Sequence, residues 1–114
     1  MKTTLIQNFK QKDSIIKKIG LEYKKIKFLE GNSLMICESE SLYLENKNDL
    51  KYYKDLKNKI DCILVQLDNQ LSRIIYNEYF SNRADNWWIY YYSKSTYYRL
   101  KNKAMDAFLE WWYV

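Results

Sequence analysis

The sequence predicts a mainly α-helical fold, and three features of the chain favour it. The 114 residues include no Pro and only two Gly, so almost nothing interrupts a helix. Hydrophobic residues make up 47% of the chain and aromatic residues 18%, which is enough apolar surface for one folded core. Several segments repeat apolar residues at steps of three and four, the spacing of one helix face. One modest helical core is therefore expected.

The first 47 residues are predicted to contain one helix and one segment whose structure stays open. The helical spacing is carried by Leu5, Phe9, Ile16 and Ile19. These residues favour a helix over 3–19, which Gly20 would end. Residues 26–44 hold a Gly-Asn turn candidate between two apolar runs, so they form either a short β-hairpin or a packed loop. The role of this N-terminal third is not decided by its residues.

Residues 48–114 are predicted to form a helical region. Its first helix, over 48–67, carries Leu50, Tyr53, Leu56, Ile60, Ile63, Leu64 and Leu67 on one face. Asp68 is a suitable N-cap for a second helix over 69–80, because its carboxylate can accept from backbone N–H groups of the first turn. Residues 81–85 are polar and short. Asp85 can then cap a short third helix that carries Trp87, Trp88 and the run Tyr90, Tyr91 and Tyr92.

The last predicted helix, over 94–112, has two unlike faces. The spacing that seats it on the core is carried by Tyr97, Leu100, Ala104, Ala107 (or Phe108) and Trp111, with Ser93 as its cap. The opposite face bears three cations and no acid before Asp106. Hydroxyls, amides and cations on the first turns of a helix can contact bases and phosphates in a DNA major groove. An ordinary solvated face is the alternative explanation. The candidate DNA-contacting residues are Ser93, Lys94, Ser95, Thr96, Tyr98, Arg99, Asn102 and Lys103.

The order of these parts also indicates a family. A helix with an aromatic tail, a Trp-containing short helix and the motif S-x-S-T-x-Y-R at 93–99 follow one another within residues 60–112. The matching residues are Ile74, Ile75, Tyr79, Trp87 or Trp88, Ser93, Ser95, Thr96, Tyr98, Arg99 and Ala104. This stretch resembles the C-terminal part of the ArpU and RinA groups of phage-encoded transcriptional regulators, which is similar to region 4 of sigma factors. The resemblance implies a helix-turn-helix over 68–112.

The resemblance also implies roles for single residues. Ser93 would cap the recognition helix and touch phosphate, and Arg99 would pair with a phosphate or a guanine edge. The residues that would point toward bases are Lys94, Ser95, Thr96 and Tyr98. The chain departs from the family pattern at Tyr90–Tyr92, where apolar and polar positions usually alternate. Those rings could bury against Trp111 and Trp112, or mark a surface for a protein partner.

The sequence thus supports two hypotheses of function. The leading one is a sequence-specific DNA-binding transcriptional regulator, an activator of phage or mobile-element late genes that recruits RNA polymerase. It binds double-stranded DNA, needs no cofactor, and could act as a homodimer. The alternative is a phage-encoded interaction protein that binds and modulates a host protein through a basic, tyrosine-rich surface. An enzyme is not expected, because no paired carboxylate, nucleophile-base pair or Gly-rich phosphate motif occurs.

Composition also bears on metal binding, membrane association and binding to polyanions. The chain has no His, and its two cysteines, Cys37 and Cys62, are expected to be buried free thiols, so no zinc site is predicted. No apolar run suits a signal peptide or a membrane span, which predicts a cytoplasmic protein that does not bind membranes. The formal net charge is +5, but exposed lysines are common on solvated helices and do not prove a polyanion partner.

Overall fold

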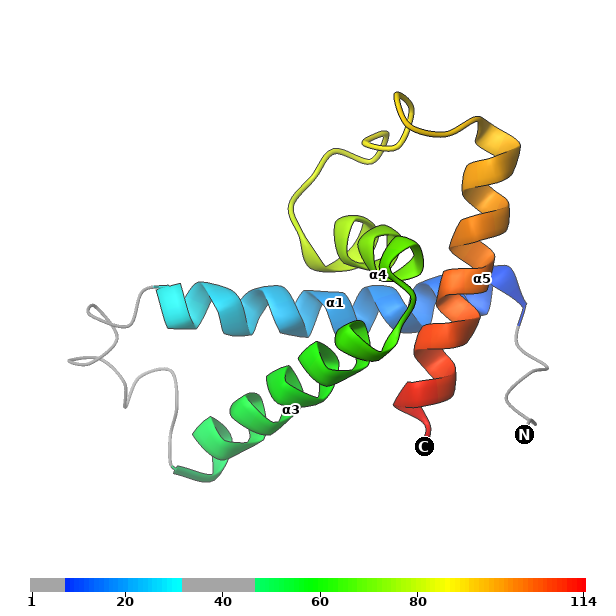
Figure 1. Cartoon of the computed structure of the whole chain (residues 1–114). Coiled ribbons are helices and arrows are strands. Elements are labelled where there is room, and N and C mark those ends of the chain that lie inside the picture. Colours follow the sequence, from blue (N-terminus) through cyan, green and yellow to red (C-terminus); the bar gives the residue numbers. More distant parts are fainter. Residues whose placement is uncertain (1–7, 32–46) are drawn as a thin grey trace.

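The structure is a computed structural model that describes residues 8–31 and 47–114. These residues form four α-helices and one π-helical turn, and none of them is in a β-strand (Figure 1). The elements are α1 (Phe9–Gly31), α3 (Lys47–Gln66), α4 (Asn69–Ile75), η2 (Tyr76–Phe80) and α5 (Lys94–Trp112). The prediction of a mainly α-helical fold is confirmed.

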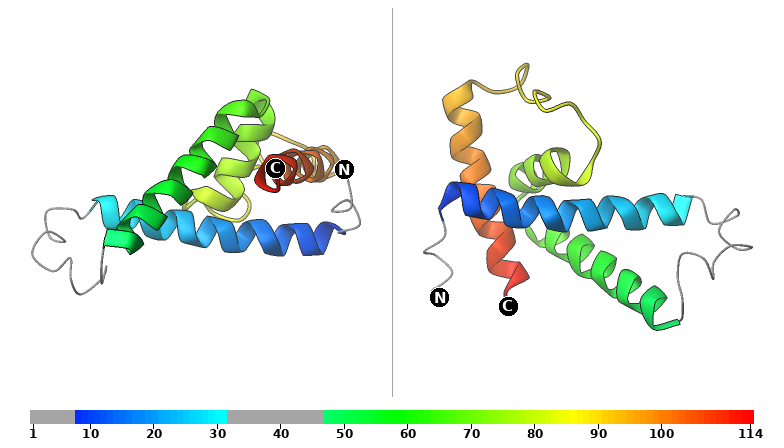
Figure 2. Two further views of the ribbon diagram at one scale, coloured as in Figure 1. Left: turned by 90° about the horizontal axis from the view of Figure 1, so that it is seen from below. Right: turned by 180° about the vertical axis from the view of Figure 1, so that it is seen from behind.

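The helices form two layers, with α1 lying across the layer that α3, α4 and α5 make (Figure 2). One hydrophobic core lies between the layers, and every element contributes to it. Burying these side chains is the main favourable contribution to folding. The largest fully buried side chains are Tyr97, Phe80, Phe108, Ile16, Ile60, Ile74, Ile75 and Met105.

Helix α1 corrects two expectations. Gly20 does not end the helix, because the apolar spacing of Ile16 and Ile19 continues through Tyr23 and Ile26, all of which are buried. Gly20 instead allows η2 to approach closely, since a Cβ atom there would overlap the carbonyl oxygen of Tyr79. The first arm of the predicted hairpin, residues 25–30, is helical as well, so that part of the hairpin is wrong. Its second arm, and residues 1–7, lie outside the described residues.

The predictions for the next two helices are confirmed to within a few residues. Helix α3 spans Lys47–Gln66, and its residues Ile60 and Ile63 are buried, as is Leu67 directly after its end. Asp68 caps α4, because its Oδ1 accepts from the backbone N–H of Gln70 at 2.9 Å. The predicted helix over 69–80 continues as the π-helical turn η2 in its second half. The turn brings two further aromatic side chains, Tyr79 and Phe80, into the core.

The predicted short helix after Asp85 is wrong. Residues 85–91 form successive turns, in which the N–H groups of Trp87, Ile89 and Tyr91 each donate to a carbonyl three residues earlier. Aromatic residues have weak helix propensity, and here ring packing determines the path of the chain. The ring of Trp88 stacks on Tyr97 at 4.4 Å between centroids and an interplanar angle of 6°. The segment that connects η2 to α5, residues 81–93, therefore packs around the ring of Tyr97, and we call it the connecting segment.

Candidate nucleic-acid interface

The outer side of α5 is an exposed basic face. Lys94, Arg99 and Lys103 are exposed, and none of them pairs with an acid among the described residues. Ser95 is exposed on the same half of the helix. The first acid in α5 is Asp106, and Lys12 of α1 neutralises it at 2.7 Å. We call Lys94, on the exposed first turn, together with Ser95, Arg99 and Lys103, on the outer side, the basic face of α5.

The beginning of this helix is fixed by its cap. Ser93 has an extended backbone, and its Oγ accepts from the backbone N–H of Thr96 at 3.3 Å. The predicted cap is therefore confirmed. Thr96 is half-buried, so it is less accessible than Lys94 and Ser95, which precede it in the same turn. The first turns of α5 extend well beyond the level at which α1 crosses the helix (Figure 1), and a partner can approach them.

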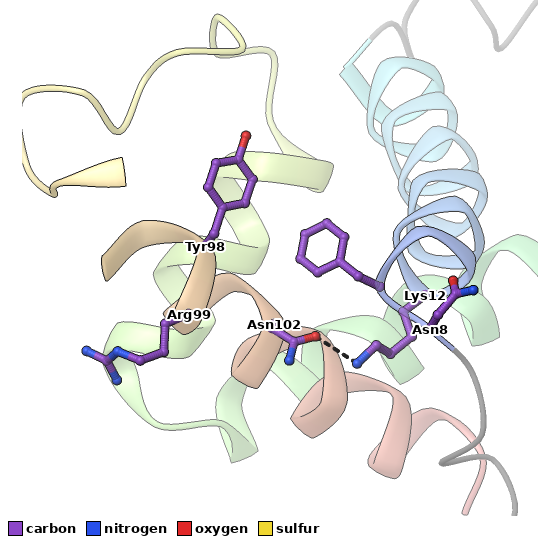
Figure 3. Close-up of a pocket in the computed structure, with 6 residues that line it drawn as sticks. Asn8, Lys12, Tyr98, Arg99 and Asn102 are labelled. Carbon is purple, nitrogen blue, oxygen red and sulfur yellow. Dashed lines mark hydrogen bonds between the residues drawn. The ribbon is translucent and has the colours of Figure 1, made fainter. Parts of the chain in front are cut away.

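Two predicted contact residues contact α1, although Tyr98 keeps 41% of its surface exposed. Asn102 accepts a hydrogen bond from Nζ of Lys12 at 2.8 Å, and the ring of Tyr98 lies 6.1 Å from that of Phe9. Figure 3 shows Asn102 directed toward Lys12, whereas Arg99 extends away from α1. The predicted site is thus divided between an accessible face and a flank that α1 already contacts.

A shallow pocket lies along this flank (Figure 3). Its volume is about 560 Å³, and it is lined by Asn8, Phe9, Lys12, Tyr98, Arg99 and Asn102. The lining mixes cations and amides with two rings. Because the pocket is wide and open, it extends the basic face of α5 toward the first turn of α1 and does not enclose a small molecule.

The inner side of α5 is held by a buried ionic cluster. The side chain of Lys101 is 8% exposed, and its Nζ lies 3.2 Å from Glu78 Oε2 and 3.5 Å from Asp13 Oδ1. Glu78 also accepts from Trp87 Nε1 at 3.0 Å and from the Tyr97 hydroxyl. Asp13 accepts from the Tyr79 hydroxyl. We call Asp13, Glu78, Tyr79, Tyr97 and Lys101 the ionic cluster; it joins α1, η2 and α5.

The two tyrosines act in the cluster as hydrogen-bond donors. Burial raises the pKa of the Tyr97 hydroxyl far above its usual range, and the hydrogen bond to Glu78 and the charge of that carboxylate raise it further. Burial likewise raises the pKa of the Tyr79 hydroxyl, with added contributions from the bond to Asp13 and from its charge. Both hydroxyls therefore keep their protons and donate to carboxylates. This arrangement fixes the rotation of α5 about its axis.

The ionic cluster was not predicted from the sequence. The signal was the position of Lys101, which lies four residues after Tyr97 and three before Ala104 on the same helix face. A lysine there must be buried, and a buried ammonium group requires carboxylates nearby. Which carboxylates serve could not be read from the sequence, because Asp13 and Glu78 come from distant parts of the chain.

The tyrosine run of the connecting segment lies apart from the C-terminal tryptophans. Tyr91 packs against Trp87 and Tyr92 against Tyr97, whereas Trp112 stacks on Phe108. Tyr90 is 92% exposed. The sequence left open whether the tyrosine run packs against Trp111 and Trp112 or forms a partner surface. These ring contacts do not support packing against the two tryptophans. The exposed rings remain available to a partner.

The described residues contain no group of three metal-ligating side chains, and no helix among them is long and apolar enough to cross a bilayer. Cys62 is exposed, which corrects the expectation of a buried thiol, and Cys37 lies outside the described residues.

Comparison of the chain with protein-family models, with curated proteins and with solved structures finds no match.

Proposed function

We propose that this protein is a DNA-binding transcriptional regulator that reads duplex DNA with the first turns of α5. The observation that carries the proposal is the basic face of α5, where Lys94, Arg99 and Lys103 are exposed and unpaired among the described residues. Cations without an acid partner attract a polyanion, and a helix fits the width of the major groove.

The proposed binding mode gives each residue a task. Ser95 and Arg99 lie on the outer side of the helix and would meet base edges, with Arg99 suited to a guanine. Lys94 and Lys103 would contact phosphates on either side, and Ser93 and Thr96 lie at the cap, where backbone N–H groups can hold a phosphate. Tyr98 and Asn102 would act from the flank beside α1.

The elements before α5 support a helix-turn-helix arrangement. Helix α4 with η2 would be the supporting helix, and the turns of residues 85–91 would take the place of the short helix that crosses the backbone in such proteins. The ionic cluster holds α5 in one rotation, so the same side chains always face outward. A fixed recognition helix loses less entropy on binding than a mobile one. On this proposal the protein is an activator of phage or mobile-element genes that acts with RNA polymerase.

The test is a salt titration of binding to a pool of random duplex DNA, with sequencing of the retained molecules. We expect one enriched motif and an affinity that falls steeply with salt. Arg99→Ala should lower affinity for the enriched motif by about tenfold or more and relax the preference at one base position. Lys94→Ala should weaken binding to all sequences and reduce the salt slope by about one.

The matched control is Lys54→Ala, which removes an exposed lysine of α3 from another part of the molecule. This variant should bind the duplex as the unaltered protein does. No enriched motif, or equal losses from Lys54→Ala and Arg99→Ala, would contradict the proposal.

A second candidate function is favoured by the exposed rings of the connecting segment. Tyr90 and Tyr91 are 92% and 63% exposed, and Ile89 beside them is exposed too. Such apolar groups next to cations suit a protein partner, so the alternative is an interaction protein that binds a host protein here. Tyr90→Ser with Tyr91→Ser should abolish that interaction and leave duplex binding intact. Loss of duplex binding in this variant would argue against a separate partner surface.

A further inference from the structure

A small pocket with mixed chemistry lies between α4, η2 and the connecting segment. It is lined by Arg73, Asn77, Arg83, Trp87, Tyr91 and Tyr92, and its volume is about 250 Å³. Two guanidinium groups, one amide and three aromatic rings thus surround one space. It shares no lining residue with the pocket beside α1, so it is a separate feature of the molecule.

The pocket is electropositive. Arg73 and Arg83 are exposed, and neither makes an ion pair with another described residue. Glu78, the acid that contacts a lining residue, is already bonded to Lys101, Tyr97 and Trp87. Two free guanidinium groups at one opening suit a phosphate, because the fork of N–H donors matches two phosphate oxygens.

The rings supply the second half of the recognition. Trp87 is held in place, since its indole N–H donates to Glu78 and its ring meets Tyr97 edge to face at 5.9 Å. Its one polar group is therefore used, and the ring surface is what it offers to the pocket. Tyr91 lies 6.4 Å from Trp87, between ring centroids, and is 63% exposed. Rings with a free face beside cations are the usual platform for stacking a nucleobase.

We propose that this pocket binds one unpaired nucleotide. Arg73 and Arg83 hold its phosphate, and the exposed ring of Tyr91 stacks on its base. Trp87, whose ring is tilted by 45° to that of Tyr91, contacts the edge of the base, and the amide of Asn77 hydrogen-bonds to a polar group of the base or sugar. The volume suits one planar ring with its phosphate and is too small for a base pair. A free mononucleotide and an unpaired nucleotide within a single strand share this chemistry. The inference stands independently of duplex binding by α5.

The experiment measures binding to the whole chain by calorimetry and by tryptophan fluorescence, with four probes. They are thymidine monophosphate, thymidine, inorganic phosphate and a short oligothymidylate. We expect the monophosphate to bind about tenfold or more tightly than thymidine or phosphate alone, because it engages the cations and the rings together. If only the oligothymidylate binds, and with the same dependence on the arginines, the natural source is a single strand.

Three variants locate the site. Arg73→Ala and Arg83→Ala should each weaken nucleotide binding about tenfold or more, and Tyr91→Ala should weaken it by a similar factor through lost stacking. These side chains are exposed, so circular dichroism should show an unchanged fold. The matched control is Lys54→Ala, which removes a positive charge from α3 and should leave nucleotide binding unchanged.

Two results would overturn the inference. One is that neither thymidine monophosphate nor the oligothymidylate binds. The other is that nucleotide binding is unaltered by Arg73→Ala and Arg83→Ala. Duplex selection gives an independent readout. Failure to enrich a duplex motif while nucleotide binding persists would refute the proposed regulator and leave the pocket standing.

Discussion

The two sides of α5 use the same residue types for opposite purposes. On the inner side, Lys101 is buried between Asp13 and Glu78. In the basic face, Lys94 on the first turn and Lys103 on the outer side are exposed and have no acid partner among the described residues. Lys101 is thus a structural residue, whereas the other two are free to meet an anion. The charge of a lysine says nothing about its role until its neighbours in space are known.

The difference teaches that the helix is positioned by polar contacts as well as by apolar packing. Tyr97, Leu100 and Phe108 bury apolar surface, but such contacts tolerate some rotation of a helix. The ionic cluster is directional, because each carboxylate must meet its own donors. A helix that contacts base edges in a DNA groove must present its side chains in one fixed direction.

The strongest test of the comparison is Lys101→Met. It leaves Asp13 and Glu78 without their shared cation in a largely buried place, and we expect the free energy of unfolding to fall by about 3 kcal/mol or more. Urea denaturation measures the loss. The matched variant Lys103→Met, two residues away on the exposed side, should change stability by about 0.5 kcal/mol at most. Equal losses of stability from Lys101→Met and Lys103→Met would contradict the difference between the inner and outer sides of α5.

Leu100→Ala should have the next largest effect. Leu100 is 7% exposed and belongs to the core, so truncation removes buried apolar surface and leaves a cavity. We expect a loss of about 2 to 3 kcal/mol in the free energy of unfolding, again from urea denaturation. A fully stable Leu100→Ala protein would mean that α5 is rotated differently from the structure.

Gly20→Ala tests the close contact between α1 and η2, which positions Tyr79 in the ionic cluster. The added methyl group must displace the backbone of η2 at Tyr79, which donates to Asp13. Better helix propensity offsets part of the strain, so the net loss should be about 1 to 2 kcal/mol. Thermal unfolding provides the measurement, with Ser14→Ala as an exposed control on the same helix. A Gly20→Ala protein more stable than the original would contradict the close approach of α1 and η2.

Alkaline pH should weaken the inner side selectively. Tyr79 and Tyr97 have folded-state pKa values raised above the ordinary 10.0, so above that pH the folded chain binds their protons more tightly than the unfolded chain does. Stability is therefore unaffected below about pH 10 and falls as the pH rises further, by about 1.4 kcal/mol per pH unit for each tyrosine. Urea denaturation across this range should show a shallower fall for Tyr79→Phe.

The exposed Tyr90→Phe is the control, and it should leave the alkaline slope unchanged. A phenol absorbance titration provides an independent check, because two of the twelve tyrosines should resist ionisation while the chain stays folded. Ionisation of all tyrosines near pH 10 in the folded protein would contradict the buried hydrogen bonds.

The smallest expected effect is that of Arg99→Ala on stability. Its side chain is exposed and makes no ion pair with the described residues, so the free energy of unfolding should change by about 0.5 kcal/mol or less. Thermal unfolding with and without duplex DNA is the measurement. A large loss without DNA would show that Arg99 supports the fold, and the basic face of α5 would no longer be a free surface.

Spacing and capping in the sequence determined α3, α4 and α5 with their caps Asp68 and Ser93. These features depend on neighbours within one or two turns, which a linear pattern records. The exposure of Ser95, Arg99 and Lys103 follows from the same periodicity, whereas Lys94, in register with the buried Tyr97 and Lys101, is exposed because it begins the helix. Sequence alone also indicated that Tyr97, Leu100 and Ala104 are buried, as the structure confirms. Trp111, which the same spacing placed on the core face, is 44% exposed, so that part of the prediction is wrong.

Tertiary contacts decided what the linear pattern could not. Helix α1 continues through Gly20 because Tyr23 and Ile26 are buried beyond it, and η2 packs against that glycine. Residues 85–91 form turns whose tryptophans pack around Tyr97, and Lys101 is buried where two distant carboxylates meet it. The division of the predicted site, with Asn102 bonded to Lys12 of α1, has the same origin. Each outcome depends on groups separated by many residues along the chain, and only the packing of helices brings such groups together.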